Sequence, residues 1–208
     1  MRNCGLIESG YSEYDYDYDK VFSASIESSK LPNEYNCMDL CDLKIEDQGN
    51  RPQCVAYAVA KLLEYNYETM NTEETGHEHV DINKQEIYDS RSNNNENNGM
   101  TIRDAMHFIK HNKYNIKGYG RLYGIFGMMK AIFTNGPIIL ALPVHDSSRV
   151  DFWNGGGYEG GHAVACVGYT KEGFIILNSW GTSYGHFGTS ILSFEDFGKI
   201  IEAWTAIV

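Results

Sequence analysis

Three residues of the sequence could together carry nucleophilic chemistry: Cys54, His162 and Asn178. A thiol becomes a strong nucleophile when it ionises, and an imidazole can hold the thiolate as an ion pair and later protonate a leaving amine. A carboxamide oxygen can accept the second N–H of the imidazole and fix the orientation of the ring. Each residue alone would more often be a buried thiol, a histidine at a strand end or a turn residue. Together they favour a thiol-dependent hydrolase.

The thiol lies at the expected start of a helix. Apolar residues recur at helical spacing over residues 54–65, and the preceding residues 47–53 contain Gly49 and Pro52, which indicate a loop. A helix N-terminus presents free N–H groups and a partial positive charge, and both favour the thiolate form of a cysteine. The sequence therefore predicts that this position activates Cys54.

An expected β-hairpin brings the histidine and the asparagine together. Residues 163–169 and 174–178 have the apolar pattern of strands, and residues 170–173 between them contain turn-forming residues. His162 precedes the first strand and Asn178 ends the second, so the two side chains should lie side by side at the open end of the hairpin.

Two further residues fit the same chemistry. Gln48 lies on the loop that enters the helix, and its amide could join the backbone N–H of Cys54 in an oxyanion hole for a tetrahedral intermediate. Trp180 follows Asn178 closely and could cover the His–Asn hydrogen bond and exclude water. A single Gln in a loop is usually exposed, and a single Trp usually packs in a core, so neither residue carries the prediction alone.

The segments around these residues resemble the motifs of the papain-like cysteine peptidase family. The nucleophile, histidine and asparagine motifs of that family are similar to residues 47–58, 161–169 and 177–188. The resemblance extends from about residue 31 to residue 208. It implies that Cys54, His162, Asn178 and Gln48 hydrolyse peptide bonds through an acyl-enzyme intermediate, with a peptide or protein as substrate and with no cofactor and no metal.

The resemblance also implies where a substrate would bind. The backbone of the substrate would pair with Gly99, in the manner of a strand added to a sheet. The residues expected near the adjoining pocket are Met100, Thr101, Ala163 and Leu142.

The sequence departs from the family pattern close to the nucleophile. Val55 stands where an aromatic residue is usual, Pro52 and Gln53 replace small residues, and Arg51 replaces a cysteine that forms a disulfide in the family. The motifs are also closer together than the roughly 130–150 residues typical of the family, which implies trimmed loops. Bacterial or viral members are more similar than lysosomal ones. An inactive papain-fold binding module, an isopeptidase and a transpeptidase remain as alternatives.

The composition excludes several other classes. The 208 residues include 17 Lys and Arg and 28 Asp and Glu, which gives a net charge of −11, and the mean hydropathy is −0.40. Such an acidic chain is unsuited to neutralising phosphates or anionic membranes, so neither nucleic acid nor a membrane is expected as a partner. The sequence lacks a transmembrane-length apolar run and a secretory signal pattern. With five cysteines at low density, we expect free thiols and a cytoplasmic, virion or host-intracellular location.

Helical patterns precede strand patterns along the chain, which predicts an α+β fold with two lobes and a cleft between them. The helical lobe should span about residues 45–118 and the antiparallel β lobe about residues 119–208. Further helices are expected from residue 102, capped by Thr101, and over residues 122–134. Further strands are expected over residues 138–142 and 190–192, and polar loops over residues 68–80 and 92–99.

Residues 1–30 differ in character from the rest of the chain. Tyr14, Tyr16 and Tyr18 alternate with three aspartates, a pattern that is polar on both sides of an extended chain. One interpretation is a mobile tail. The other is an inhibitory segment that contacts the cleft, and the expected absence of a longer propeptide favours it. The oligomeric state is left open by the sequence.

Overall fold

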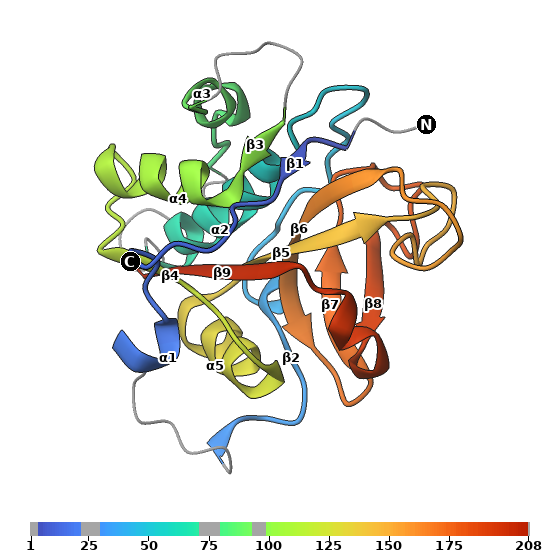
Figure 1. Ribbon diagram of the computed structural model, residues 1–208. Coiled ribbons are helices and arrows are strands. Elements are labelled where there is room, and N and C mark those ends of the chain that lie inside the picture. The colour runs from blue at the N-terminus through green and yellow to red at the C-terminus, as the bar shows by residue number, and fades with distance from the viewer. Residues whose placement is uncertain (1–3, 22–29, 71–79, 93–98, 208) are drawn as a thin grey trace.

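The computed structural model describes residues 4–21, 30–70, 80–92 and 99–207 (Figure 1). One half of the molecule contains the helices α2 (Cys54–Met70), α3 (Lys84–Asp89) and α4 (Ile102–His111). The helix α2 is buried on almost all sides because it packs against α3 and α4 and also against the sheet. Its nearly continuous run of small and apolar side chains suits this central position.

The other half contains a strongly connected antiparallel sheet. Its strands are β4 (Gly118–Arg121), β5 (Ile138–Val144), β6 (Gly160–Tyr169), β7 (Gly173–Leu177), β8 (Thr189–Ser193) and β9 (Glu202–Ile207). The pairs β4–β9, β9–β5, β5–β6, β6–β7 and β7–β8 are all antiparallel. The helix α5 (Ile125–Asn135) packs against β5, β6 and β9, and the 3-10 helix η3 (Phe194–Lys199) connects β8 to β9.

The side chains of β5 point alternately into two buried clusters. Leu140 and Leu142 belong to one, the β-lobe core, which contains most of the apolar side chains of the sheet and α5. Ile139 and Ala141 belong to the other, the helical-lobe core, which contains most of α2. This division follows from the two-residue period of a strand. The strand β5 therefore joins the two halves of the molecule through its opposite faces.

The N-terminal segment is ordered over residues 4–21 and lies against both halves (Figure 1). The short strand β1 (Leu6–Ile7) runs parallel to β3 (Met100–Thr101), and Leu6 pairs antiparallel with Gly161 of β6. The helix α1 (Tyr18–Val21) follows. Residues 4–21 therefore have defined contacts with the rest of the fold, and the two interpretations of residues 1–30 stay predictions. A second short strand, β2 (Tyr35–Asn36), pairs with the far end of β6 and leads into η2 (Cys37–Asp39).

Most of the elements expected from the sequence are present. The Thr101 hydroxyl accepts from the N–H of Asp104 at 3.0 Å, so the predicted cap of α4 is confirmed. The helix α5 ends at Gly136, whose positive φ of 88° suits glycine. The helix α2 continues to Met70, so the loop expected from residue 68 begins later; residues 71–79 lie outside the described part. The loop expected at residues 92–99 also lies largely outside it.

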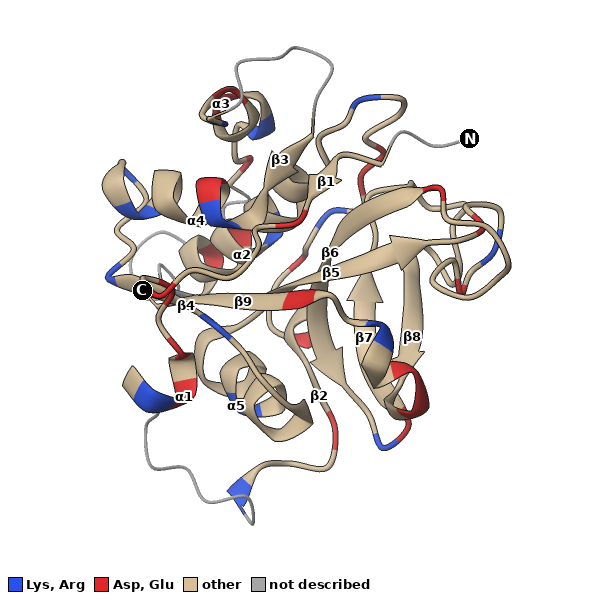
Figure 2. Ribbon diagram, viewed as in Figure 1, with Lys and Arg blue, Asp and Glu red and all other residues tan. Residues whose placement is uncertain are grey.

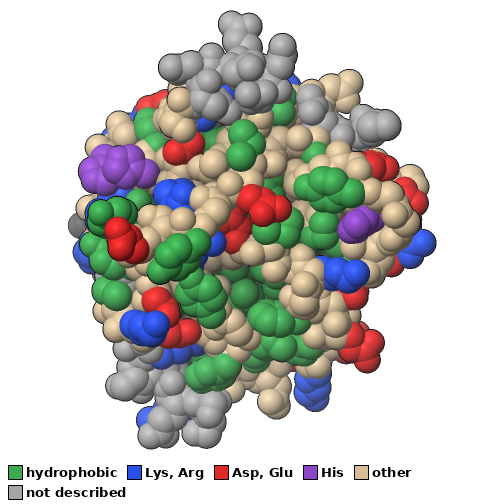
Figure 3. Space-filling view, in the orientation of Figure 1, with side chains coloured by type: hydrophobic (Ala, Val, Ile, Leu, Met, Phe, Trp, Pro, Cys, Tyr) green, Lys and Arg blue, Asp and Glu red, His purple; other side chains and the backbone are tan. Residues whose placement is uncertain are grey.

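Acidic and basic residues are distributed over both halves, with several acids along the N-terminal segment (Figure 2). Viewed from the same side, hydrophobic and charged side chains are mixed across the surface (Figure 3). Among the helices of the described ranges, none combines the length and the apolar character needed to traverse a bilayer.

Candidate active site

Cys54 is the first residue of α2 and is completely buried. Its sulfur accepts backbone hydrogen bonds from Ala163 of β6, from Gly5 of the N-terminal segment, and from Val55 and Cys54 itself at the helix start. Burial raises the pKa of the thiol, and these hydrogen bonds offset the effect only in part. The sulfur therefore lies between the two halves of the molecule, in an environment that keeps it protonated while the N-terminal segment is in place.

His162 and Asn178 meet at the open end of the hairpin formed by β6 and β7. The imidazole Nε2 lies 2.8 Å from Asn178 Oδ1, and that oxygen also accepts from the backbone N–H of Ser179 at 2.8 Å. Because the Ser179 N–H can only donate, the Asn178 atom is an acceptor, and the histidine must donate from Nε2. This arrangement fixes the tautomer and leaves Nδ1 as the ring nitrogen that can exchange a proton.

Aromatic rings enclose the imidazole. The Trp180 ring stacks on His162 with centroids 4.6 Å apart and an angle of 28° between the planes. Phe152 meets the imidazole edge-on at 5.5 Å. All three side chains are buried, so the hydrogen bond between His162 and Asn178 is shielded from water.

Gln48 is held beside Asn178 although it comes from the loop before α2. The Ser179 hydroxyl donates to Gln48 Oε1 at 2.6 Å, and Gln48 Nε2 donates to the Arg51 carbonyl at 2.8 Å. The backbone N–H of Gln48 also donates to the Ser179 carbonyl at 2.9 Å. Sequence reasoning missed Ser179; its position next to Asn178 in the same motif is the signal that could have identified it.

The residues expected to bind substrate lie largely along β1. The Met100 N–H donates to the Gly5 carbonyl at 2.7 Å, and Leu6 pairs with Met100 and packs with it in the helical-lobe core. A Cβ at Gly99 would overlap the Gly5 backbone, so only glycine allows this approach. Thr101 uses its side chain to cap α4.

Two other predicted pocket residues face different ways. Ala163 belongs to the helical-lobe core together with Met100 and Cys54. Leu142 belongs to the β-lobe core, so the structure does not place it with Met100 and Ala163. The place of Leu142 beside a substrate pocket stays a prediction; in the sheet Leu142 is paired with His162 of β6.

The N-terminal segment fills the space between Cys54 and Gly99. A Cβ at Gly5 would overlap the carbonyl of Pro52, just before the nucleophile. Since Gly5 also contacts the Cys54 sulfur and Met100, the segment occupies the position expected for the backbone of a substrate. Such close contacts explain why Cys54 and His162 are buried.

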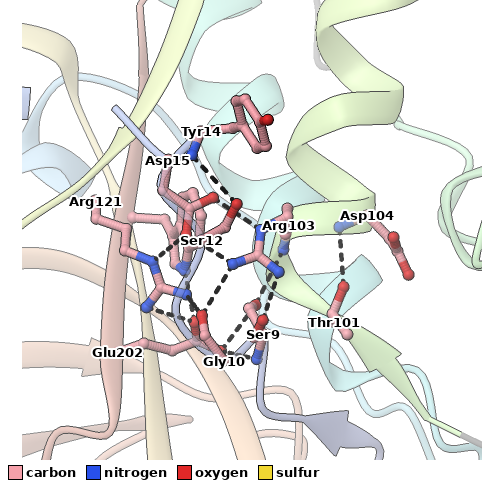
Figure 4. A network of polar contacts seen from close by, with 11 residues as sticks. Ser9, Gly10, Ser12, Tyr14, Asp15, Thr101, Arg103, Asp104, Arg121 and Glu202 are labelled. Atoms are coloured by element: carbon pink, nitrogen blue, oxygen red, sulfur yellow. Dashed lines mark hydrogen bonds and ion pairs between the residues drawn. The ribbon is translucent and has the colours of Figure 1, made fainter. Parts of the chain in front are cut away.

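Beyond β1, the segment is held by a network of charged residues from both halves (Figure 4). Arg103 of α4 contacts both carboxylate oxygens of Asp15, at 2.7 and 2.8 Å, and Arg121 of β4 contacts the same carboxylate at 2.7 Å. Both guanidinium groups also donate to the carbonyl of Gly10. Burial alone would raise the pKa of the Asp15 carboxyl, but the two arginines outweigh it and hold the pKa below its ordinary value.

Glu202 of β9 completes this network, which we call the arginine clasp and define as Asp15, Arg103, Arg121 and Glu202. One oxygen of Glu202 accepts from the backbone N–H and the hydroxyl of Ser9, both at 3.1 Å. The other lies 3.2 Å from Arg121 Nη1 and accepts from an indole N–H at 3.0 Å. The clasp therefore ties residues 9–15 to α4, β4 and β9.

Among the residues that the structure describes, no group of three or more His, Cys, Asp or Glu is placed to hold a metal ion.

Comparisons with known proteins agree with this arrangement. The model of the papain family of cysteine proteases matches residues 112–196. Cathepsin B-like CP2 of Giardia intestinalis is 40% identical over 84 residues, which make up 35% of this chain and 27% of that protein. The matching part thus spans about a quarter of the length of this relative.

Solved structures extend the likeness to the whole fold. Xylellain, a cysteine protease from Xylella fastidiosa, superposes with a TM-score of 0.77 at 19% identity and covers 100% of this chain and 98% of its own. Procathepsin B S9 from Trypanosoma congolense gives a TM-score of 0.73 at 12% identity, with 98% and 85% covered. The α+β fold and the resemblance predicted from the motifs are confirmed: the chain has a papain-like fold, and its residues 112–196 match the papain family of cysteine proteases.

Proposed function

We propose that this protein hydrolyses peptide bonds through an acyl-enzyme intermediate formed on Cys54. The thiolate attacks the carbonyl carbon of the scissile bond, and His162 Nδ1 donates a proton to the departing amine. His162 then accepts a proton from water, which cleaves the thioester and restores the thiol. Asn178 keeps the imidazole in the required tautomer throughout, since it accepts from Nε2 at 2.8 Å.

Gln48 and the N–H of Cys54 would stabilise the oxyanion of the tetrahedral intermediate. The side chain of Gln48 is fixed at both ends, by Ser179 at 2.6 Å and by the Arg51 carbonyl at 2.8 Å. A donor that is already oriented needs no rearrangement when charge develops on the substrate, and this supports its role. The backbone N–H at the start of α2 adds the favourable end of the helix dipole.

The observation that carries the proposal is the buried hydrogen bond between His162 and Asn178, which Trp180 covers. The residue after His162 is Ala163, whose backbone N–H contacts the Cys54 sulfur. The test is the variant Cys54→Ala, assayed with a library of fluorogenic peptides under reducing conditions. We expect hydrolysis and labelling by thiol-directed epoxides to be lost while circular dichroism remains unchanged. The variant Cys166→Ala removes another fully buried thiol and should retain activity. Turnover by Cys54→Ala would refute the proposal.

We further propose that residues 4–7 block this activity until the segment is displaced. Removing residues 1–30 is a poor test, because it also removes Tyr18, which is buried and hydrogen bonded to Thr134 and Asn135. Gly5→Val is sharper, because any Cβ at this position meets the Pro52 carbonyl. The variant should label and hydrolyse faster than the unchanged protein, whereas Gly156→Ala should not, since its Cβ would meet no atom and its backbone does not need glycine. Equal rates for the Gly5→Val variant and the unchanged protein would contradict the block.

The same variant separates a peptidase from an inactive binding module. In Gly5→Val the sulfur should lose its cover, and in an active site its pKa should fall well below the ordinary value of about 8.5 as it pairs with His162. A binding module would keep a raised pKa. Adding a primary amine to the assay and analysing the products by mass spectrometry distinguishes a hydrolase from a transpeptidase.

A further inference from the structure

A second thiol lies beside the candidate nucleophile. Cys4 directly precedes Gly5, so its Cα is two covalent bonds from the backbone nitrogen that contacts the Cys54 sulfur. On its other side, Cys4 approaches Gly160 at the start of β6, where an added Cβ would lie 3.1 Å from the Cys4 Cβ. Cys4 is a thiol outside any disulfide and is only partly buried. The strand β1 thus carries this thiol to the edge of the catalytic centre.

The other cysteines have different surroundings. Cys37, Cys41 and Cys166 are buried in the β-lobe core, whereas Cys54 belongs to the helical-lobe core. Burial, followed by the Cys54 sulfur and the Glu159 carboxylate, raises the pKa of the Cys4 thiol to about 12. Gly5, the next residue, lies so close to the backbone before Cys54 that an added Cβ would be 2.1 Å from the Pro52 carbonyl oxygen, which places Cys4 beside the candidate nucleophile.

We propose that Cys4 and Cys54 form a reversible disulfide that locks the N-terminal segment over the active site when the protein meets a peroxide. The proposal takes Cys54 to be the nucleophile described above. The Cys54 thiolate attacks hydrogen peroxide, so its sulfur becomes a sulfenic acid and hydroxide departs. The Cys4 thiol then attacks the sulfenic sulfur, the S–S bond forms, and the sulfenic oxygen leaves as water. In total, two thiols and one peroxide yield one disulfide and two waters.

The state of the segment sets the order of these steps. While β1 is seated, burial keeps both thiols protonated, so oxidation must begin when the segment lifts and Cys54 meets His162. The returning segment brings Cys4 to the oxidised sulfur. The resulting disulfide both prevents further oxidation of the nucleophile and holds the cover closed, and a reducing agent reverses both effects.

The test compares the full-length protein with Cys4→Ser after treatment with hydrogen peroxide. In the unchanged protein we expect the mass to fall by two hydrogen atoms, with a linked pair of proteolytic fragments that contain Cys4 and Cys54. Excess dithiothreitol should then restore labelling of Cys54. In Cys4→Ser, Cys54 should gain two oxygens and resist restoration by dithiothreitol. The matched control Cys41→Ser should behave like the unchanged protein.

The outcomes distinguish the disulfide from the proposed function. Equal recovery of Cys54 in Cys4→Ser and in the unchanged protein would overturn the disulfide, as would cross-links between chains or to Cys37. Because fragment mapping needs no substrate, a Cys4–Cys54 disulfide in a protein that hydrolyses no peptide would support the lock and count against the peptidase. Hydrolysis of peptides by a protein that yields no linked fragments would support the peptidase and count against the disulfide.

Discussion

The proposed catalytic centre and the segment that covers it are held by different kinds of interaction. His162, Asn178 and Gln48 are fixed by hydrogen bonds that involve backbone groups and neutral side chains in buried structure. Residues 9–15 are fixed chiefly by the arginine clasp, whose groups come from α4, β4 and β9. Neutral hydrogen bonds depend little on salt or pH. An ion pair weakens when the salt concentration rises, and it weakens when a low pH protonates its carboxylate.

The strand that carries His162 also makes many more contacts with the rest of the fold than the strand of the N-terminal segment does. The strand β6 is hydrogen bonded along its length to β5 and β7, so His162 cannot move without disturbing the sheet. The strand β1 contains two residues, and Leu6 alone of these is buried. The centre is thus part of the folded core, while its cover is a short strand with charged anchors. A single substitution should therefore disable the centre and leave the cover in place, and another should release the cover and leave the centre intact.

The largest expected effect is on the centre. His162→Ala removes the group that exchanges protons with the substrate, and activity should fall about 10²–10⁴-fold. The cavity left by this buried side chain should lower the thermal unfolding temperature, but the clasp should be unaffected, so the protection of residues 4–7 from hydrogen exchange should stay the same. His107→Ala, on the exposed side of α4, is the control and should retain full activity. Loss of protection along with activity would show that centre and cover are not independent.

The next effect is on the cover. Asp15→Ala leaves Arg103 and Arg121 without their shared carboxylate, and hydrogen bonds to charged groups contribute about 1.5–3 kcal/mol each. Losing one such contribution should raise the rate of Cys54 labelling roughly tenfold to a hundredfold. The control is Asp17→Ala in the same segment, because Asp17 pairs with the exposed Lys20 at 3.0 Å. Equal rates in both variants would mean that the clasp does not hold the segment.

The same contrast explains what the sequence predicted well. Cys54, His162 and Asn178 could be assigned because each lies at the end of an element with a clear local pattern, and the strands β6 and β7 are adjacent in the sequence. A short turn pairs Tyr169 with Phe174, and a bulge between Cys166 and Gly168 then shifts the register by one residue, so that Ala165 pairs with Leu177. Local patterns therefore specified this hairpin, and the position of His162 beside Asn178 followed.

Other features depend on contacts between distant parts of the chain. Asp15 lies far in sequence from Arg103 and Arg121, and no local pattern links them. The strand β4 was missed because its GYGR sequence lacks an apolar run and is stabilised by pairing with β9. The strand β9, with Trp204 near its centre, was not predicted because its sequence EAWTAI does not alternate between polar and apolar residues and the strand is buried on both faces. The pairing of β1 could not be predicted because two residues carry too little pattern.

A pH titration sharpens the comparison further. The arginines lower the pKa of Asp15 in the seated segment below the value of 3.8 that it regains on release. Asp15 therefore stabilises the closed state fully above about pH 4, and this contribution is lost as the pH falls through the lowered value. Arg103, Arg121, Glu202 and Tyr119 face the carboxylate, and the arginines stay charged over this range.

The measurement is the ratio of Cys54 labelling rates in Asp15→Ala and the unchanged protein, because ionisation of the thiol itself affects both alike. The ratio should be constant from about pH 5 to pH 8 and fall toward one as the pH drops through the lowered pKa of Asp15, below 3.8. A ratio that changes steeply near neutral pH would assign the control of the segment to another group.

The smallest effect should come from Ser179→Ala, which tests how the centre is positioned. The Ser179 hydroxyl holds Gln48 Oε1 at 2.6 Å, and a hydrogen bond of this kind contributes about 0.5–1.5 kcal/mol. If Gln48 stabilises an oxyanion, kcat for peptide hydrolysis should fall roughly twofold to tenfold with KM unchanged. Alkylation of Cys54 by iodoacetamide involves no oxyanion, so its rate should not change, and Ser183→Ala on the exposed loop should alter neither rate. If the rate of alkylation falls together with kcat, Ser179 acts on the Cys54 thiol or on His162. Gln48 would then not be positioned independently of the Cys54 and His162 side chains.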